Sequence, residues 1–400
     1  MGPFQQRFPD IHVRLIIPAT NVFGTENYHS ETVEELHKHS PTKLPEIIAI
    51  PHATSPIRTI IYRMQKTSGG VGSPLLYAFL YRRWLKSVQT YLQSVMQPDD
   101  VVHYVNHVAA SLLPNWRKAL GGKHIFGPVS GTEALPIQMS NLREVARNIA
   151  VGLTRIRLIR VLRKNDIIFC ISNQDYAFFK RRVSTVIRLS EQNVDRAEMS
   201  NPSLNARTQK TDQPNHAGPL KILWVGELVR RKRVDVLKKI VEDTAHWPVE
   251  LTIIGHGPLR RMLADVEVLP NIKVMSRVTR NEVLQLMRGH DVLLHTSYRE
   301  ATATVITEAV NSGCRVLCHN VGGHSLIVTD PRDLIPIAPV SESALMFMER
   351  IAQLIDGHTA LGAQRGPYPN AATWSDFQET LFDVYNRIFN ETPKGEANGV

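Results

Sequence analysis

Glu300 and Glu308 are the two carboxylates whose spacing points most directly to chemistry. Glu300 follows the apolar run 291–294, which is typical of a buried strand, and residues 301–311 have the apolar spacing of a helix that Gly313 ends. One carboxylate is therefore expected at a strand exit and the other inside a helix. The free N–H groups and the dipole at that helix start favour a phosphate, so the stretch predicts a nucleotide-phosphate site. The simpler alternative is that the carboxylates only complement the helix dipole.

The composition is that of a soluble globular protein with two domains. The chain has 400 residues, more than the roughly 250 to 300 at which single cores stop growing. Its cysteines, Cys170, Cys314 and Cys318, lie in apolar surroundings without metal-type spacing, which fits a reducing cytosol. No apolar run approaches the ~20 residues that span a bilayer, and the N-terminus lacks the order of a signal peptide. We therefore expect a cytoplasmic protein.

A net charge of +10 implies an anionic partner, which could be a nucleic acid, an acidic membrane or a phosphorylated substrate. Nucleic acid is disfavoured because the basic residues lack interleaved aromatic residues for base stacking. The most basic helical segment is residues 155–164, in which Arg155, Arg157, Arg160 and Arg163 alternate with apolar residues. It could lie on an acidic membrane face, or its arginine stems could cover a core stripe.

Strands alternate with helices along the chain, which predicts parallel sheets. In an N-terminal domain of residues 1–200, we expect strands at residues 11–18, 46–50, 99–105, 123–131, 166–172 and 183–189 and helices at residues 32–38, 75–95 and 138–164.

Residues 201–218 are polar and aperiodic and are read as a linker, after which residues 219–372 form a second doubly wound domain. Its strands are expected at residues 221–225, 249–254, 272–275, 291–295, 315–318 and 334–337, and its helices at residues 234–244, 259–266, 280–288, 303–312 and 342–356. Residues 373–391 are a terminal amphipathic helix, and residues 392–400 are read as a disordered tail.

Ligands of open parallel sheets bind at the carboxyl ends of the strands, where the informative residues of the second domain fall. Gly226 precedes a basic run that could clamp a diphosphate. The turn Gly255-His-Gly257-Pro and the pair Gly322-Gly323 would let a ligand approach the backbone closely. A three-glycine fingerprint is absent, so a dinucleotide site is unsupported.

Four segments of the second domain resemble the successive motifs of the retaining GT-B glycosyltransferases of family 4. They are G-E-L-V-R-R-K, I-I-G-H-G-P-L, the stretch 291–317 and N-V-G-G, and the helix T-W-S-D-F-Q-E-T-L-F-D-V-Y-N-R-I resembles that family's closing helix. The resemblance covers residues 219 to about 330. It implies an α/β GT-B fold, in which two Rossmann-like doubly wound domains face each other across a cleft and the C-terminal helix crosses back to the first.

The resemblance implies that Lys232 holds the donor diphosphate. The family's arginine after the first glycine is here Glu227, and we hypothesise that Arg231 or Arg230 replaces it.

The same resemblance gives roles to the stretch around the two carboxylates. Glu300 matches the first glutamate of the E-x7-E motif, near the donor sugar, and Glu308 matches the second, which binds the ribose hydroxyls. Thr304 and Val305 fall where backbone amides meet the diphosphate.

On the acceptor side, H-Y-V-N-H and I-F-G-P-V-S-G resemble the family's strand and Gly-Pro turn. They make His103 or His107 the candidate active-site histidine and Gly127 and Gly131 acceptor-side glycines. Residues 11–18 resemble the family's second strand, so we expect the chain to begin inside the domain, with residues 68–72 a weak stand-in for the glycine-rich turn.

The resulting hypothesis is retaining transfer of a hexose from a nucleotide diphosphate sugar to a glycan or lipid-linked acceptor, in polysaccharide or glycolipid synthesis. The nucleotide sugar is a co-substrate, no other cofactor is expected, and no metal is needed because cationic side chains and helix amides stabilise the leaving diphosphate. The protein would be cytoplasmic, on the inner membrane face where its acceptor requires that. The alternatives are a nucleotide-sugar epimerase of the same fold and a non-catalytic nucleotide-sugar-binding protein.

Overall fold

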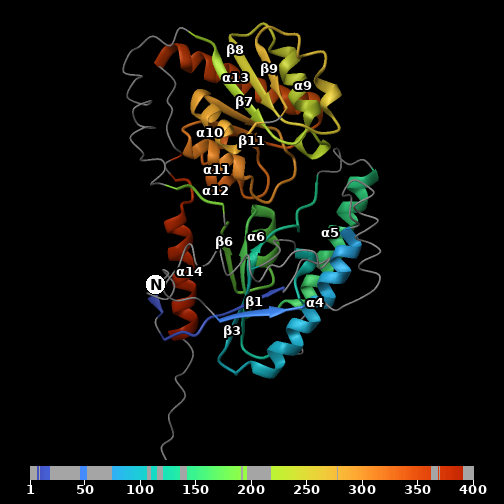
Figure 1. Ribbon diagram of the computed structural model, residues 1–400, viewed down its shortest axis with the longest axis vertical. Helices are drawn as coiled ribbons and strands as arrows, with labels where there is room; N and C mark the ends of the chain where they lie inside the picture. Colours follow the sequence, from blue (N-terminus) through green and yellow to red (C-terminus); the bar gives the residue numbers. More distant parts are fainter. Residues whose placement is uncertain are drawn as a thin grey trace, which may run out of the picture.

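The computed structural model describes residues 7–8, 10–18, 46–51, 74–105, 110–114, 120–135, 142–190, 192–195, 218–276, 278–361, 368 and 370–390. They form two α/β domains, stacked along the long axis of the molecule in Figure 1. The expected helix at residues 32–38, most of the linker 201–218, and the tail 392–400 lie outside these residues and stay predictions.

The N-terminal domain contains two parallel sheets. The first pairs β1 with β2, and the second has the order β3-β4-β5-β6. The strands are β1 (Arg14–Pro18), β2 (Glu46–Ile50), β3 (Val101–Tyr104), β4 (Lys123–Val129), β5 (Ile167–Cys170) and β6 (Thr185–Arg188). The helices are α4 (Pro74–Val95), η1 (Ala110–Leu112), α5 (Leu142–Val161) and α6 (Asn173–Lys180).

The short helix α6 is absent from the sequence-based expectation, which passes directly from one strand to the next. Its start does carry a signal, because Ser172 is the N-cap and its Oγ accepts a hydrogen bond from the amide of Asp175. Asp175 is fully buried. The helix is therefore fixed by its cap and by tertiary contacts, while its eight residues are too few for a clear apolar period.

The C-terminal domain has one six-stranded parallel sheet of order β12-β11-β10-β7-β8-β9. Its strands are β7 (Leu220–Val225), β8 (Val249–Ile254), β9 (Ile272–Met275), β10 (Val292–His295), β11 (Arg315–His319) and β12 (Leu334–Ile335). Its helices are η3 (Arg230–Lys232), α9 (Val234–Asp243), η4 (Arg260–Leu263), α10 (Arg280–Gly289), α11 (Thr304–Asn311), α12 (His324–Ile327), η5 (Pro331–Asp333) and α13 (Val340–Leu361).

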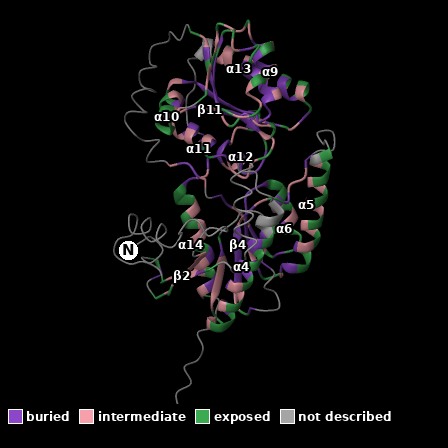
Figure 2. Ribbon diagram, turned by 45° about the vertical axis from the view of Figure 1, so that its right-hand side comes forward, coloured by how far each residue is buried: buried purple, intermediate pink, exposed green. Residues whose placement is uncertain are grey.

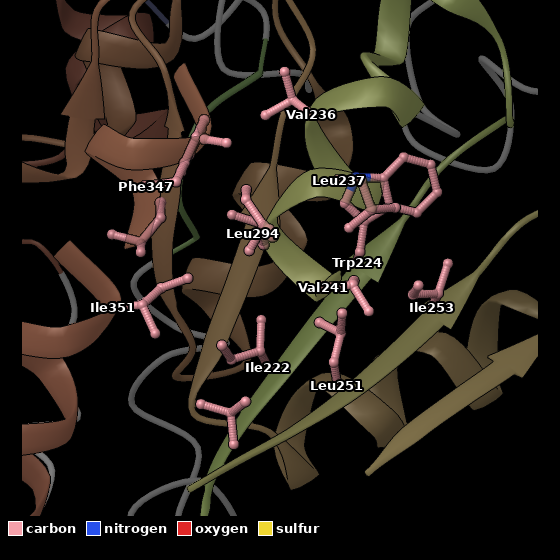
Figure 3. Close-up of a cluster of buried hydrophobic side chains, with 14 of the residues drawn as sticks. Ile222, Trp224, Val236, Leu237, Val241, Leu251, Ile253, Leu294, Phe347 and Ile351 are labelled. Atoms are coloured by element: carbon pink, nitrogen blue, oxygen red, sulfur yellow. The ribbon is translucent and has the colours of Figure 1, made fainter. Parts of the chain in front are cut away.

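The sheet of this domain forms because its central strands are apolar on both faces, as parallel strands covered by helices require. Trp224 of β7 and Leu294 of β10 face Leu237 of α9 and Phe347 of α13 in one buried cluster (Figure 3). Each such side chain contributes about 1.5–3 kcal/mol when fully buried.

Two predicted boundaries in this domain are corrected. The helix expected at residues 259–266 is the shorter 3-10 turn η4, and the helix around Glu308 begins at Thr304 and not at Ala301. Gly313 follows α11 with a φ of +84° and ends it, as predicted.

The C-terminal helix α14 (Trp374–Asn390) crosses back to the N-terminal domain, as the resemblance implies (Figure 1). Its residues Val384 and Ile388 share a buried cluster with Ile125 of β4 and Phe169 of β5. The helix therefore covers one face of the N-terminal sheet. No described helix combines the length and apolar character needed to cross a membrane.

Candidate functional site

Glu300 lies at the exit of β10 with three donors on one of its oxygens. Lys232 Nζ is 2.5 Å and Arg231 Nη1 2.7 Å from Glu300 Oε1, and Ser297 Oγ lies 2.9 Å from the same atom. The side chain of Lys232 is 10% exposed and that of Glu300 14%. The predicted glutamate and the predicted lysine of the diphosphate site are therefore joined, and with Arg231, whose side chain is 37% exposed, they form the Lys232–Arg231–Glu300 cluster.

Burial of Glu300 tends to raise its pKa, but the positive charge of Lys232, its hydrogen bond and the charge of Arg231 outweigh burial, so the pKa is lowered. Glu300 is thus a carboxylate at neutral pH. An anion held between two cations can orient hydroxyl groups, and it does not provide the proton that an acid catalyst would.

Hydrogen bonds between the exits of β7 and β10 hold the backbone of Arg231 and Lys232 in place. Trp224 Nε1 donates to Thr296 Oγ1 at 3.1 Å, and that hydroxyl donates to the carbonyl of Lys232 at 2.6 Å. The amide of Tyr298 donates to the carbonyl of Arg231 at 3.1 Å. Arg233, which follows Lys232, has a φ of +52°, the one positive value among the non-glycine residues that the structure describes. A bulky residue there marks a backbone that the surrounding contacts impose.

Two of the predicted glycines are required by close backbone approach. A Cβ at Gly255 would overlap the carbonyl oxygen of Gly226, so the exits of β7 and β8 touch. Gly322 has a φ of +53°, and a Cβ there would overlap the carbonyl oxygens of Glu300 and Ala301. Both turns therefore support the loops that carry the charged cluster.

The other two donor-cleft glycines lie beside these. A Cβ at Gly257 would meet the Leu228 carbonyl oxygen at 2.6 Å. The amide of Gly323 donates to the carbonyl of Ala301 at 2.6 Å.

Helix α11 carries on one side the residues that are predicted to contact the diphosphate and the ribose. Thr304 and Val305 form its first turn, and its N-cap, Ala303, offers no side-chain oxygen to the first amides. Glu308 lies one turn further along the helix, so it shares a face with Thr304 and Val305. Its Oε1 accepts a hydrogen bond from Arg280 Nε at 2.7 Å, and the Arg280 side chain is 75% exposed.

The structure distinguishes the two candidate arginines. Arg231 contacts Glu300, whereas Arg230 is exposed and lines a separate cavity of about 510 Å³ with Tyr298 and Glu144. Glu227 is 3.8 Å from Arg231 Nη2. The negative charge that departs from the family pattern is therefore partly compensated by the arginine that also reaches Glu300.

On the acceptor side, His103 bridges the sheet and the crossing-back helix. Its Nδ1 is 2.5 Å from Tyr385 Oη of α14, and its Nε2 is 3.0 Å from the carbonyl of Gly127. Burial lowers its pKa to about 4, against the effect of the Gly127 hydrogen bond. His103 is thus a neutral packing residue whose described contacts do not include Glu300. His107 lies outside the described residues.

Glu133 is a half-buried carboxyl that the sequence reasoning missed, just after Gly131 at the exit of β4. Burial raises its pKa, as does the charge of Asp175, while hydrogen bonds from Ser172 and from the backbone of Gly322 act in the opposite direction. Gly322 belongs to the C-terminal domain. Glu133 therefore faces the loop that supports Glu300, and its only sequence signal is its place after a glycine at a strand exit.

Further contacts join the two domains at the same edges of their sheets. Ser190 Oγ and Thr302 Oγ1 are 2.8 Å apart, and Arg188 Nη2 donates to Ser325 Oγ at 2.9 Å. Tyr298 Oη donates to Glu144 Oε1 at 2.8 Å. The carboxyl ends of the strands of both domains therefore face one another.

A family comparison covers the domain that carries most of these residues. Residues 206–361 match the model of the glycosyl transferases group 1 family. The lipopolysaccharide glucosyltransferase WaaG of Escherichia coli is 34% identical over 116 residues, which cover 27% of this chain and 30% of that protein. The D-inositol 3-phosphate glycosyltransferase of Pseudarthrobacter chlorophenolicus is 25% identical over 207 residues, covering 47% of this chain and 42% of the relative. The chain thus spans less than half the length of the curated relatives it matches.

The fold as a whole is shared with a sucrose-phosphate synthase from Thermosynechococcus elongatus. The two align with a TM-score of 0.57 over 94% of this chain and 99% of the other, at 15% identity. Together with the two facing parallel sheets and the crossing-back helix, this agreement shows that the chain has the GT-B fold.

Proposed function

We propose, from the match of residues 206–361 to the glycosyl transferases group 1 family, that this protein is a glycosyltransferase that moves a hexose from a nucleotide diphosphate sugar with retention of configuration. The observation that carries the proposal is the Lys232–Arg231–Glu300 cluster at the exit of β10, beside the first turn of α11.

The leaving group of such a transfer is a nucleoside diphosphate, whose charge grows as the sugar–phosphate bond breaks. Lys232 is a largely buried cation, so its electrostatic stabilisation is stronger than in water, and Arg231 adds a second positive charge from a side chain that is 37% exposed. The amides of Thr304 and Val305 add the positive end of the α11 dipole. We propose that these four groups bind the diphosphate, so that no metal ion is required for this step.

The carboxylates bind the two sugars of the donor. Glu300 is ionised and is held by its contacts at Oε1, so it can accept hydrogen bonds from hexose hydroxyls. Glu308 would exchange its contact with the exposed Arg280 for the ribose hydroxyls. Because no double-displacement nucleophile is evident in the sequence, we propose same-face attack, in which the donor phosphate accepts the proton of the acceptor hydroxyl.

The acceptor is proposed to be a glycan carrier or lipid at an acidic membrane, on the basis of α5. Six large apolar residues of α5 are exposed, and their spacing of three or four residues places them along one side of the helix, which we call the α5 stripe. Figure 2 shows exposed segments along α5. They are Leu142 at 89% exposure, Val145 at 43%, Ile149 at 60%, Leu153 at 62%, Ile156 at 51% and Ile159 at 41%. An exposed apolar stripe on a basic helix is typical of a helix lying in a membrane interface.

The arginines in and just after α5 form hydrogen bonds within their own domain, whereas the sequence also allowed them to contact an acidic membrane. Arg155 of α5 donates to the carbonyl of Thr132 and Arg157 to the carbonyl of Leu113, and Arg163, two residues beyond the end of the helix, donates to the carbonyl of Leu120. These contacts anchor α5 to its domain. The apolar stripe, not these arginines, is the surface that we expect to meet lipid. Two relatives are named for lipid acceptors: the lipopolysaccharide glucosyltransferase and a phosphatidylinositol N-acetylglucosaminyltransferase subunit of Saccharomyces cerevisiae.

The donor half of the proposal is tested by incubating the protein with UDP-, GDP- and ADP-hexoses and measuring released nucleoside diphosphate. We expect one donor to turn over, and Glu300→Gln to lower the rate while retaining nucleotide binding. Binding of a donor without turnover would favour the non-catalytic protein, and interconversion of the sugar without an acceptor, followed by NMR, would favour the epimerase.

The membrane half is tested by vesicle flotation with phosphatidylglycerol-containing liposomes. Leu153→Asp should weaken binding by about tenfold or more, because a charge replaces an apolar contact. Arg157→Gln serves as a matched change of charge on the same helix and should affect stability more than flotation. Equal binding of Leu153→Asp and the unaltered protein would remove the membrane role.

A further inference from the structure

A cavity of about 510 Å³, which we call the Arg230 cavity, lies between the two domains. Its described walls are formed by Leu135 and Glu144 of the N-terminal domain and, in the C-terminal domain, by Tyr298 and by residues in η3, in η4 and at the starts of α9 and α13. Small-molecule sites have volumes of about 300–1,000 Å³. The cavity therefore has the size of a site for a small molecule that contacts both domains.

The Arg230 cavity is next to the donor site but does not include it. Arg230, the first residue of η3, lines the cavity, whereas the next two residues of η3 contact Glu300. Tyr298 also lines the cavity, and Glu300 follows it by two residues. A ligand in the cavity would therefore lie beside the Lys232–Arg231–Glu300 cluster and leave the cluster free for a donor.

Two arginines of the cavity wall are incompletely paired. The Arg230 guanidinium forms no hydrogen bond or ion pair with the described residues. Arg233 is 3% exposed and donates from Nε to Asp235 and from Nη1 to the carbonyl of Ala338, but its Nη2 has no partner among the described residues. Its φ of +52° is a conformation that glycine adopts without strain, so an arginine there favours a role for the side chain itself.

The rest of the wall adds further positive potential. Glu144 and Asp235 are its described carboxylates, and both are held by protein donors: Glu144 Oε1 accepts from Tyr298 Oη at 2.8 Å, and Asp235 Oδ1 accepts from a backbone amide of α9 at 2.9 Å. Val234 and Val340, the first residues of α9 and α13, line the cavity, so the positive ends of two helix dipoles lie there. Together with the unpaired guanidinium groups, these dipoles favour an anion with several acceptor oxygens, such as a phosphate.

The apolar part of the wall and the α5 stripe indicate what carries this phosphate. Leu135, Leu259 and Met262 line the cavity, so the bound molecule has an apolar or ring-shaped part beside its charged group. Glu144 lies in the first turn of α5, between the first two residues of the α5 stripe. The cavity and the apolar stripe therefore meet at the same turn of α5.

We propose that the Arg230 cavity binds the phosphate group of a phosphorylated acceptor, which is either a sugar phosphate or the headgroup of a lipid phosphate. The role of acceptor rests on the proposed function, to which this inference adds a chemical class and a place. Arg230 binds two phosphate oxygens with its planar guanidinium group, and Arg233 and the two helix starts stabilise the charge. The phosphate stays on the acceptor and holds it beside the donor cluster.

The test measures binding of glucose-6-phosphate to the full chain by titration calorimetry. Arg230→Gln should weaken binding by about tenfold or more, because a charge-assisted pair of hydrogen bonds is lost. Arg261→Gln is the matched control, because Arg261 is exposed, lies in η4 and is not among the described lining residues. It should leave binding unchanged. Equal binding by Arg230→Gln and the unaltered protein would overturn the proposal.

A second titration, with UDP, GDP and ADP, separates this cavity from the donor site. Lys232→Met should weaken nucleoside diphosphate binding more than it weakens glucose-6-phosphate binding. Loss of glucose-6-phosphate binding in Lys232→Met but not in Arg230→Gln would place the phosphate in the donor cluster and contradict the proposal. Absence of nucleoside diphosphate binding would instead count against the proposed donor site, and Arg230→Gln would still decide about the cavity.

Vesicle flotation distinguishes the two sources of the phosphate. Phosphatidic acid carries a phosphate monoester, as a sugar phosphate does, whereas the phosphate of phosphatidylglycerol is a diester. Flotation that is stronger with phosphatidic acid than with phosphatidylglycerol, and that Arg230→Gln weakens, would support the proposal with a lipid headgroup as ligand. Binding of glucose-6-phosphate without this preference would support it with a soluble sugar phosphate. A protein that binds glucose-6-phosphate not at all and shows no preference for phosphatidic acid would overturn the proposal.

Discussion

The two domains use their charged and polar side chains differently at the edge where they face each other. In the C-terminal domain, Lys232 and Arg231 meet Glu300 within hydrogen-bonding distance, and side-chain and backbone bonds hold them from two strand exits. In the N-terminal domain, His103 contacts Tyr385 of α14, and β1, α4 and β3 border a cavity of about 450 Å³.

This difference suggests that the donor side is organised before any ligand binds, while the acceptor side is not. A preorganised charge cluster costs no reorganisation when the diphosphate charge develops. The acceptor side presents a half-buried carboxyl, Glu133, in a domain whose described strands form two separate sheets. Substitutions can therefore change the donor side and the acceptor side separately. Their expected effects on turnover and on stability differ in size.

The largest effect is expected at Lys232. Lys232→Met removes a buried cation from both Glu300 and the diphosphate, and turnover should fall by about 10²–10³-fold, as on loss of one oxyanion-hole donor. Steady-state release of nucleoside diphosphate measures it. Arg230→Met is the matched control, because Arg230 is exposed and lines a different cavity. A larger loss at Arg230 than at Lys232 would contradict the proposed arrangement.

A smaller effect, on stability, is expected at Gly255. Gly255→Ala forces a methyl group onto the Gly226 carbonyl oxygen and should destabilise the protein by about 1–3 kcal/mol through backbone displacement. Gly152→Ala in α5 meets no atom within 4 Å and should raise stability by a few tenths to about 1 kcal/mol. Urea unfolding compares the two, and equal effects would mean that the strand exits of the C-terminal domain are not closely packed.

The free energy of unfolding should depend on pH because His324 is buried. Burial lowers the pKa of His324 from 6.5 to about 4, although Glu300 nearby opposes this and Lys232 adds to it. In the unfolded chain, His324 therefore binds a proton below pH 6.5, whereas in the folded chain it binds that proton only below about pH 4. The free energy of unfolding therefore does not depend on His324 above pH 6.5. As the pH falls from 6.5 to about 4, it decreases by about 1.4 kcal/mol per pH unit.

His324→Asn keeps a donor toward the carbonyl of His319 and cannot titrate. Urea unfolding between pH 7 and pH 5 should show a slope shallower by about one proton for this variant. An unchanged slope in His324→Asn would show that His324 is not held neutral by burial.

The smallest effect concerns the contact between the domains. Tyr298 Oη donates to Glu144 Oε1, and a partly exposed hydrogen bond of this kind contributes about 0.5–1.5 kcal/mol. A double-mutant cycle of Tyr298→Phe and Glu144→Leu should give a coupling energy in that range. A coupling energy of zero would mean that this bond does not help to hold the domains together.

Much of the donor side was predictable because its signals are local. The strand exits carry Gly226, Gly255, Glu300 and Gly322 in sequence order, and parallel strands bring their carboxyl ends to one edge. The spacing of Glu300 and Glu308 likewise depends only on a strand followed by a helix. The acceptor side was not predictable in the same way, because the role of His103 depends on Tyr385, 282 residues away.

The sequence by itself determined the alternation of strands and helices, the GT-B resemblance and the candidate residues at the strand exits, because these follow from periodicity and local spacing. Only the tertiary structure decided that Arg231 and not Arg230 reaches Glu300, that Arg155 and Arg157 anchor α5 while its apolar stripe is exposed, and that a cavity lies between β1 and β3. Each of these depends on which distant elements pack together, and packing between distant elements leaves no period in the sequence.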